Sequence, residues 1–218
     1  MRRRYFAMGL AILMILFVPL FIFTGQNAGG KLAEASMDEP YQYPITPADE
    51  AWADFKTSQA MYDACQIPDG VLTRMTTEAL LETVLNYPFL GTYKCYDDCE
   101  TAAGYLCGQF NGLEELLARD DLTGILLERY ADSKVLTQEE LNENSRLRLG
   151  YVDTFFESEN LEFLIGCDRL RNGQYSEADS ETFNALFSEK AQLRKEESNI
   201  YSGAGGAYVA FVRQLSEM

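Results

Sequence analysis

Acidic and phenolic side chains gather around the stretch Tyr93–Glu100, between two expected helices. Two carboxylates can serve as the acid and base of a glycosidase, and several together can bind calcium. However, Asp97 and Asp98 are adjacent and point in different directions, one of them is explained as a helix cap, and the calcium-loop pattern D-x-D-x-D-G is absent. The stretch therefore predicts either a plain solvated loop or an exposed recognition patch, since tyrosine is enriched at interfaces. The candidate patch residues are Tyr87, Tyr93, Tyr96, Asp97, Asp98, Asn111 and Arg119.

Histidine is absent from the chain. This composition excludes Ser-His-Asp and Cys-His nucleophilic catalysis, histidine general bases and histidine-ligated metal sites. Because no other catalytic constellation is recognisable, we expect a protein that is not an enzyme, with no cofactor and no bound metal.

Five cysteines offer redox chemistry, and their odd number leaves at least one thiol without an intramolecular partner. Residues four apart in a helix have Cβ atoms roughly 5–6 Å apart, which is too far for a disulfide. A Cys95–Cys99 disulfide therefore requires Cys95 to lie in the loop before the helix. The alternative is that Cys99, Cys107 and Cys167 are small buried residues on apolar helix faces.

Charge restricts the partners. The chain has 34 acidic and 18 basic residues, and three of the basic ones, Arg2 to Arg4, lie before position 24, so the part after that position carries a net charge of about −19. Such a surface repels phosphate backbones, and we expect no nucleic-acid partner. The charge predicts a well-solvated surface, or alternatively a docking face for a basic partner or for cations.

The N-terminus reads as an export signal. Three arginines, Arg2 to Arg4, precede nineteen mostly apolar residues, 5–23, which at 1.5 Å per residue span roughly 28 Å, close to a bilayer core. We predict a signal-anchor or a cleaved signal peptide over 1–24, a flexible tether over 25–43 and a folded domain over 44–218. Both alternatives place the domain outside the cytoplasm, either tethered to the cell membrane with the N-terminus cytoplasmic or secreted.

Caps and apolar periodicity predict that this domain is all-α, a single compact unit of six to nine helices, several of them short. Thr76, Asp97 or Asp98, Asp120 and Ser176 are helix caps, and Thr137 opens a capping box with Glu140. Stretches alternating with period two are too short to require a strand. The expected helices span 47–65, 77–86, 98–110, 113–117, 121–131, 137–158, 161–171, 177–198 and 203–215.

Two motifs carry a resemblance. The stretches TEALLETVLNYPF (77–89) and FNGLEELLARD (110–120) resemble a recurring, largely uncharacterised helical module of exported or surface-anchored bacterial proteins. The resemblance implies export and a helical fold and implies no activity. Judged from their residues alone, the motifs have a structural role, which includes a Glu115–Arg119 ion pair across one helical turn. The alternative is that they bring Tyr87, Asn111 and Arg119 together in a ligand-binding notch.

The sequence thus predicts an exported, membrane-tethered, non-enzymatic helical module that binds another protein at the cell envelope. The alternative is a carboxylate-based hydrolase or carbohydrate-binding protein that uses the Tyr/Asp-rich joint at 93–100. Convergence of its carboxylates in a pocket favours this alternative, whereas exposed Tyr93 and Tyr96 favour the binding module.

Overall fold

The computed structural model describes residues 36–140, 156–173 and 175–197, in which helices are the regular elements and no strand is formed. This confirms the all-α class for the described part of the chain. The helices are η1 Glu50–Asp54, α1 Ser58–Ala64, α2 Asp69–Leu72, α3 Thr77–Leu85, η2 Leu90–Cys95, α4 Cys99–Gln109, α5 Asn111–Leu116, α6 Leu122–Asp132, α9 Glu157–Asn172 and α10 Glu177–Glu196, where η marks a 3-10 helix. The predicted membrane segment 5–23, the expected helix 203–215 and most of 137–158 lie outside the described residues.

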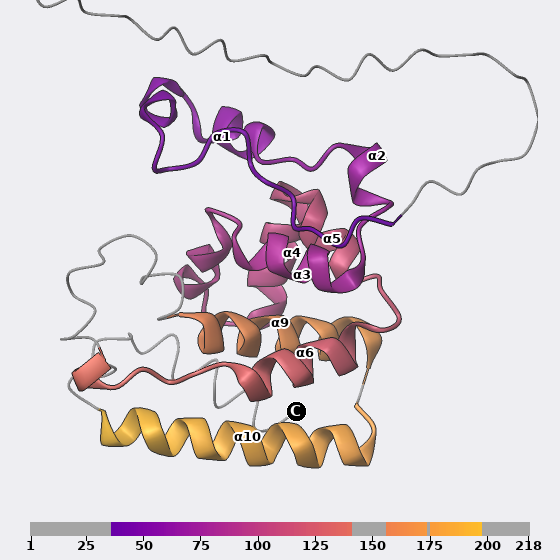
Figure 1. Ribbon diagram of the computed structural model, residues 1–218, viewed down its shortest axis with the longest axis vertical. Helices are drawn as coiled ribbons and strands as arrows, with labels where there is room; N and C mark the ends of the chain where they lie inside the picture. Colours follow the sequence, from indigo (N-terminus) through magenta and orange to yellow (C-terminus); the bar gives the residue numbers. More distant parts are fainter. Residues whose placement is uncertain (1–35, 141–155, 174, 198–218) are drawn as a thin grey trace, which may run out of the picture. The chain divides into compact units, whose positions relative to one another are not determined.

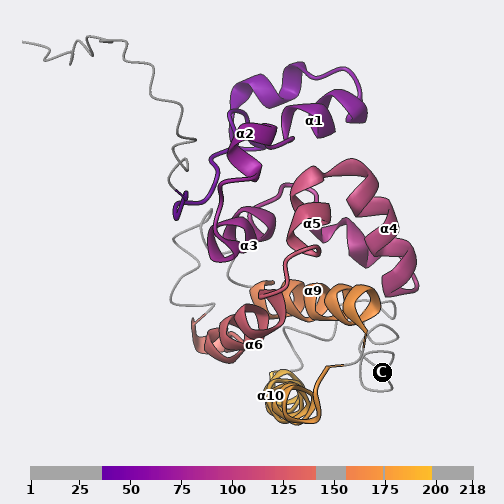
Figure 2. The ribbon, with the colours of Figure 1, turned by 90° about the vertical axis from the view of Figure 1, so that its right-hand side faces the viewer.

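Helix α9 is the centre of the packing. Figure 1 shows it running beside α6, with the α3–α4–α5 group on one side of this pair and α10 on the other, and Figure 2 shows α10 nearly end-on, below both α6 and α9. Because α9 has neighbours on both sides, even its polar residues Ser158, Glu159, Glu162 and Asp168 are almost fully buried. A helix covered all round needs internal partners for its charges.

Local capping explains where several helices begin. The side chains of Thr76, Asp98 and Ser176 accept hydrogen bonds from the backbone N–H groups three residues on, which confirms three predicted caps. The predicted cap at Asp120 is wrong: α6 begins after Asp121, whose carboxylate accepts a hydrogen bond from the Thr77 hydroxyl at 2.7 Å instead of capping.

The expected helix 47–65 is wrong as a continuous element. It divides into η1 and α1, with Phe55 extended between them. Thr57 restarts the helix, since its side chain accepts from Ala60 N. Trp52 packs edge-on against Phe55 and tilted against Phe89, both with ring centroids 5.6 Å away, and is half-buried rather than central to the core.

Part of the predicted flexible tether, residues 36–43, packs against the folded domain. Met37 pairs with the backbone around Met75 and Thr76, and the backbone N–H of Tyr41 donates to the Thr83 hydroxyl at 2.9 Å. The predicted boundary at position 44 is therefore too late, and the packed domain includes this strip of chain.

Candidate functional site

A cleft of about 870 Å³ opens beside the C-terminal end of α3. One wall is the N-terminal strip 41–48, another is the turn 86–88, and the floor includes the first turn of α9. Its described lining residues are Tyr41, Gln42, Tyr43, Thr46, Pro47, Ala48, Leu85, Asn86, Tyr87, Pro88, Leu90, Gly91, Lys94, Phe156 and Asn160. A volume of this size falls in the range of ligand sites.

Thr83 holds the N-terminal wall in place. Its hydroxyl accepts from Tyr41 N and donates to Ala79 O, and its carbonyl accepts from the Tyr43 hydroxyl at 2.9 Å. Because Thr83 is fully buried within α3, these bonds anchor a strip of chain that has no helix of its own. The wall is thus set by the fold before any ligand arrives.

The motif Asn86-Tyr87-Pro88 forms the second wall. Pro88 disfavours the helical region for Tyr87, the residue before it, so α3 ends at Leu85 with Asn86 as its C-terminal cap and the chain turns. The ring of Tyr87 then stacks on Phe110, with centroids 4.1 Å apart and planes within 5°. The sequence motif therefore shapes this cleft.

Two buried polar atoms at the cleft have no partner within the described part of the chain. They are the hydroxyl of Tyr87 and the side-chain oxygen Oδ1 of Asn160. Burial raises the pKa of Tyr87 well above the usual value, so the hydroxyl stays protonated and can donate. A buried group without a partner costs about 1–3 kcal/mol, and such groups in a cleft are typical of sites that complete their hydrogen bonds with a ligand.

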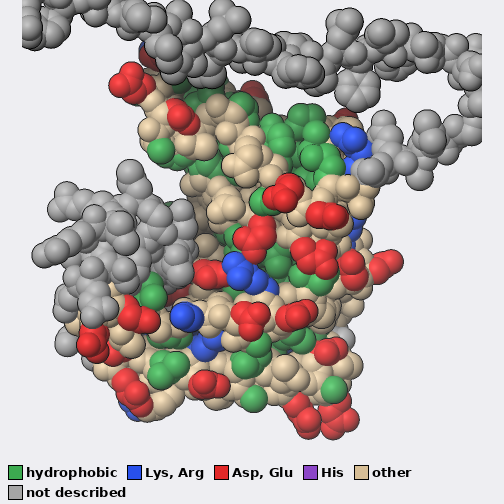
Figure 3. Space-filling view, in the orientation of Figure 1, with side chains coloured by type: hydrophobic (Ala, Val, Ile, Leu, Met, Phe, Trp, Pro, Cys, Tyr) green, Lys and Arg blue, Asp and Glu red, His purple; other side chains and the backbone are tan. Residues whose placement is uncertain are grey.

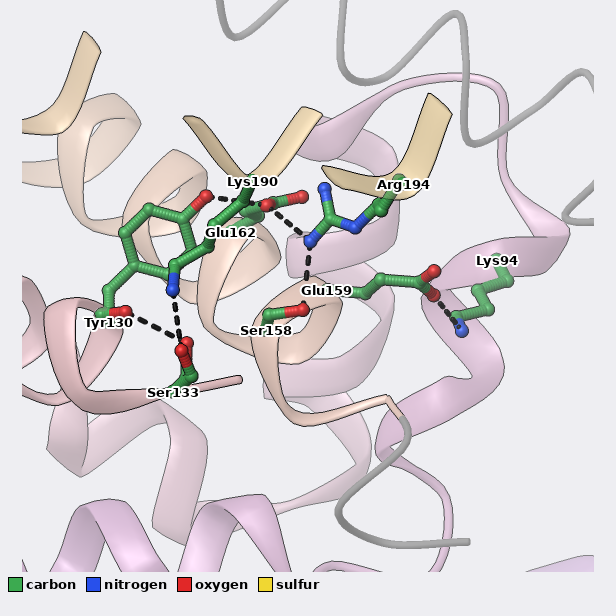
Figure 4. A network of polar contacts seen from close by, with 8 residues as sticks. All are labelled: Lys94, Tyr130, Ser133, Ser158, Glu159, Glu162, Lys190 and Arg194. Atoms are coloured by element: carbon green, nitrogen blue, oxygen red, sulfur yellow. Dashed lines mark hydrogen bonds and ion pairs between the residues drawn. The ribbon is translucent and has the colours of Figure 1, made fainter. Parts of the chain in front are cut away.

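A lysine with a compensated charge lies at the end of the cleft. Lys94 pairs with the buried Glu159, Nζ to Oε2 at 2.5 Å, and its ammonium lies 3.6 Å from the ring centroid of Phe156. Figure 4 shows Lys94 and Glu159 facing one another, away from the neighbouring network of Glu162. Glu159 holds the ammonium in one position, so the cleft presents a fixed donor with little net charge.

The structure does not assemble the predicted Tyr/Asp patch. Tyr93 is 4% exposed and stacks on Phe163 in the core, and Tyr96 is half-buried against Tyr105. Asp97 is exposed, and it makes no hydrogen bond or ion pair with another described residue. Asp98 caps α4, accepting from Thr101 N at 2.7 Å, and these hydrogen bonds lower its pKa. The patch prediction is thus wrong for Tyr93, because the η2 turn directs its ring inward.

The side chains of Asn111 and Arg119 form their hydrogen bonds within the fold. Asn111 accepts from Ile67 N at 3.0 Å and donates to Ile67 O at 2.7 Å, so it joins the start of α5 to the chain before α2. Arg119 donates to Leu72 O and pairs with Glu115 at 2.9 Å, as the spacing predicted. The predicted notch of Tyr87, Asn111 and Arg119 is therefore not formed, and only Tyr87 lines the cleft.

No family model, curated protein or solved structure matches this chain. The resemblance carried by 77–89 and 110–120 stays a prediction.

A second polar cluster, which the sequence did not reveal, joins α6, α9 and α10 (Figure 4). The oxygen Oε1 of Glu162 accepts from the Tyr130 hydroxyl at 2.6 Å and from Arg194 at 2.7 Å, and Arg194 also donates to Ser158. Lys190 donates to Ser133 O nearby. All five side chains are buried and bonded to one another or to backbone, which makes this cluster a structural one.

Asp168 is the third buried carboxylate of α9. It accepts from Thr123, Asn172 and Tyr175 at 2.6–2.7 Å. Three neutral donors satisfy its oxygens, so it too belongs to the scaffold. In the part of the chain that the structure covers, no group of three or more Cys, Asp or Glu is arranged to hold a metal, and no helix is long and apolar enough to cross a bilayer.

The cysteines are free thiols. Cys95 is exposed at the end of η2, whereas Cys99 is buried and turned toward α9, with its sulfur 3.7 Å from that of Cys167. The structure therefore places Cys99 beside Cys167, a neighbour the sequence did not indicate, instead of pairing it with Cys95.

Proposed function

We propose that this protein is an exported, non-enzymatic binding module that holds an extended segment of another protein in the cleft around Tyr87. The observation that carries the proposal is the pair of buried, unpartnered polar atoms, Tyr87 Oη and Asn160 Oδ1, in a cleft walled by aromatic rings.

The chemistry of the walls favours a polypeptide. Rings of Tyr41, Tyr43, Tyr87 and Phe156 line the cleft together with Pro47 and other apolar side chains. Aromatic-lined grooves bind extended, proline-containing segments because these have little conformational entropy to lose. The Tyr87 hydroxyl and Asn160 Oδ1 are both closed to solvent, so a shift of the cleft wall is needed before the hydroxyl donates to a backbone carbonyl and Oδ1 accepts from a backbone N–H of the bound segment.

The charge of the domain favours a basic partner. Figure 3 shows acidic side chains spread over the face in view and outnumbering basic ones. A domain with this acidic excess and an almost neutral cleft attracts a segment with an apolar, proline-containing centre and Lys or Arg on either side.

The carbohydrate alternative has weaker support. Asp97, Asp98, Glu100 and Glu115 are not among the described residues that line the cleft. A hydrolase acting here would lack its carboxylate pair in the described walls, so only non-catalytic sugar binding on the aromatic rings competes with the peptide proposal.

Selection from a random 12-residue peptide display library on the immobilised full-length chain, in mild detergent, tests the proposal. We expect enriched peptides to share proline and basic residues, and to lose about tenfold in affinity for Asn160→Ala. Asn184→Ala, the same change at an exposed position of α10, is the matched control and should bind like the parent chain.

A panel of oligosaccharides is tested in parallel on the same variants. Sugar binding that depends on Asn160, without peptide enrichment, would overturn the peptide proposal in favour of the carbohydrate alternative. Peptides that bind the Asn160→Ala chain equally well would show that the cleft is not the site.

A further inference from the structure

Two buried thiols on different helices lie in contact. Cys99 is the first residue of α4 and Cys167 lies in the middle of α9; each is 1% exposed, and their sulfurs are 3.7 Å apart across 68 residues of sequence. A disulfide bond is about 2.05 Å long, so the two sulfurs need to approach by roughly 1.7 Å, which is within reach of small side-chain rotations and helix shifts.

The remaining cysteines are less suitable partners for Cys99. Cys95 is exposed, whereas the Cys99 sulfur is buried against α9, 3.9 Å from Phe163 O. Cys107 lies two turns further along α4 and is half-buried.

We propose that Cys99 and Cys167 form a disulfide that ties α4 to α9 once the chain reaches an oxidising compartment. This rests on the export that the proposed function includes. Each cysteine gives up its thiol proton, one S–S bond forms, and the two electrons pass to the disulfide of an oxidising exchange partner. The partner's S–S bond breaks, and its two sulfurs take up two protons to become thiols.

Burial decides when this exchange occurs. Removal from water raises the pKa of Cys167 well above the usual value, so in the folded, reduced chain the attacking thiolate is scarce and inaccessible. Oxidation therefore takes place while the chain folds, before α9 packs on α4. The folded reduced protein should accordingly resist oxidation for hours in a buffer that oxidises the refolding chain.

The test is to refold the full-length chain from urea in a buffer of reduced and oxidised glutathione, with dithiothreitol as the reducing arm. Free thiols are alkylated, and chymotryptic peptides are identified by mass without reduction. Chymotrypsin suits the problem because Tyr96 and Tyr105 separate Cys99 from Cys95 and Cys107. We expect one disulfide, linking the peptides of Cys99 and Cys167, and three alkylated cysteines.

The bond should also raise the melting temperature of the oxidised protein above that of the reduced protein by roughly 10 °C. Cys99→Ala and Cys167→Ala should each abolish this difference, whereas Cys95→Ala, at an exposed position, should keep it. The peptide map of the unaltered chain does not depend on whether these variants fold.

A Cys95–Cys99 link, a mixture of pairings or five alkylated thiols after refolding would overturn the proposal. These outcomes are read on refolded protein and depend neither on export nor on the cleft, whose peptide binding is measured on the Asn160 variants, so failure of this inference and failure of the proposed function are distinguishable.

Discussion

Arg194 of α10 lies 2.7 Å from Glu162 of α9, and neither side chain is more than 8% exposed to solvent. The same carboxylate oxygen accepts from the Tyr130 hydroxyl of α6. A single buried carboxylate thus connects three helices, which also share apolar packing and further polar contacts such as Thr123–Asp168. Removing one member leaves a buried charge without its partner, which costs more than the intact pair contributes.

Arg194→Met should therefore lower the free energy of unfolding by about 3–5 kcal/mol, because the buried carboxylate of Glu162 loses the positive charge of Arg194. The double variant Glu162→Leu/Arg194→Met should cost clearly less than Arg194→Met alone. Glu115→Ala, which removes a partly exposed pair with Arg119, is the control and should cost about 0.5 kcal/mol or less. Urea unfolding measures all three. Equal losses for the single and double variants would contradict the account.

Gly112 is required by close packing. A Cβ at this position would lie 2.4 Å from the Phe110 ring and 2.8 Å from Ile67 Cδ1. Gly112→Ala should destabilise the fold by about 1–3 kcal/mol because the core must shift to admit the methyl group. Gly104→Ala, in the middle of α4 with no atom within 4 Å, should instead stabilise it by about 0.5–1 kcal/mol. The melting temperatures of the two variants should move in opposite directions, and an unchanged or raised melting temperature for Gly112→Ala would show that Gly112 is not constrained.

The fold should weaken in alkali. Burial raises the pKa of Cys65 to about 11 and raises the pKa of several buried tyrosines well above their ordinary value near 10, namely Tyr43, Tyr87, Tyr130 and Tyr175. Between pH 9 and 11 the unfolded chain therefore binds fewer protons than the folded chain, and stability falls as the pH rises. The urea midpoint should be lower at pH 10.5 than at pH 8. A urea midpoint that stays constant or rises would contradict the burial of Cys65 and these tyrosines.

The tyrosine at the cleft makes a separate prediction. Tyr87→Phe removes a buried hydroxyl that has no partner among the described residues, so it should raise the free energy of unfolding by up to about 1 kcal/mol. The same change should weaken binding of a selected peptide about tenfold. Calorimetry of the free protein and titration with the peptide measure the two effects. A loss of stability greater than about 1 kcal/mol would mean that the hydroxyl is bonded within the fold.

Local signals explain what the sequence predicted well. The caps at Thr76, Asp98 and Ser176 act within one helical turn, so residue type and spacing suffice to locate the starts of α3, α4 and α10. The Glu115–Arg119 pair is local for the same reason. The all-α class follows from the sum of such signals.

Long-range contacts explain what the sequence missed. Tyr41 and Tyr43 bond to Thr83, about 40 residues away, so the strip looks like a tether until α3 is in place. Likewise, the sequence predicts a helix over 161–171 but not the burial of Glu162 and Asp168, which follows from the packing of α9 on both sides. Tyr93 looked exposed because its neighbours are polar, yet the η2 turn directs its ring to Phe163.

Photo-crosslinking in cells that export the full-length chain tests the central claim, that the cleft holds an extended segment of another protein, most directly. A benzophenone amino acid replaces Asn86, which is exposed and lines the cleft, and in a matched control it replaces Asn184 on α10. The account predicts an adduct at position 86 alone, with crosslinked peptides that map to one proline-containing, basic segment of a partner protein. Identical adducts at both positions, or none at position 86, would contradict it.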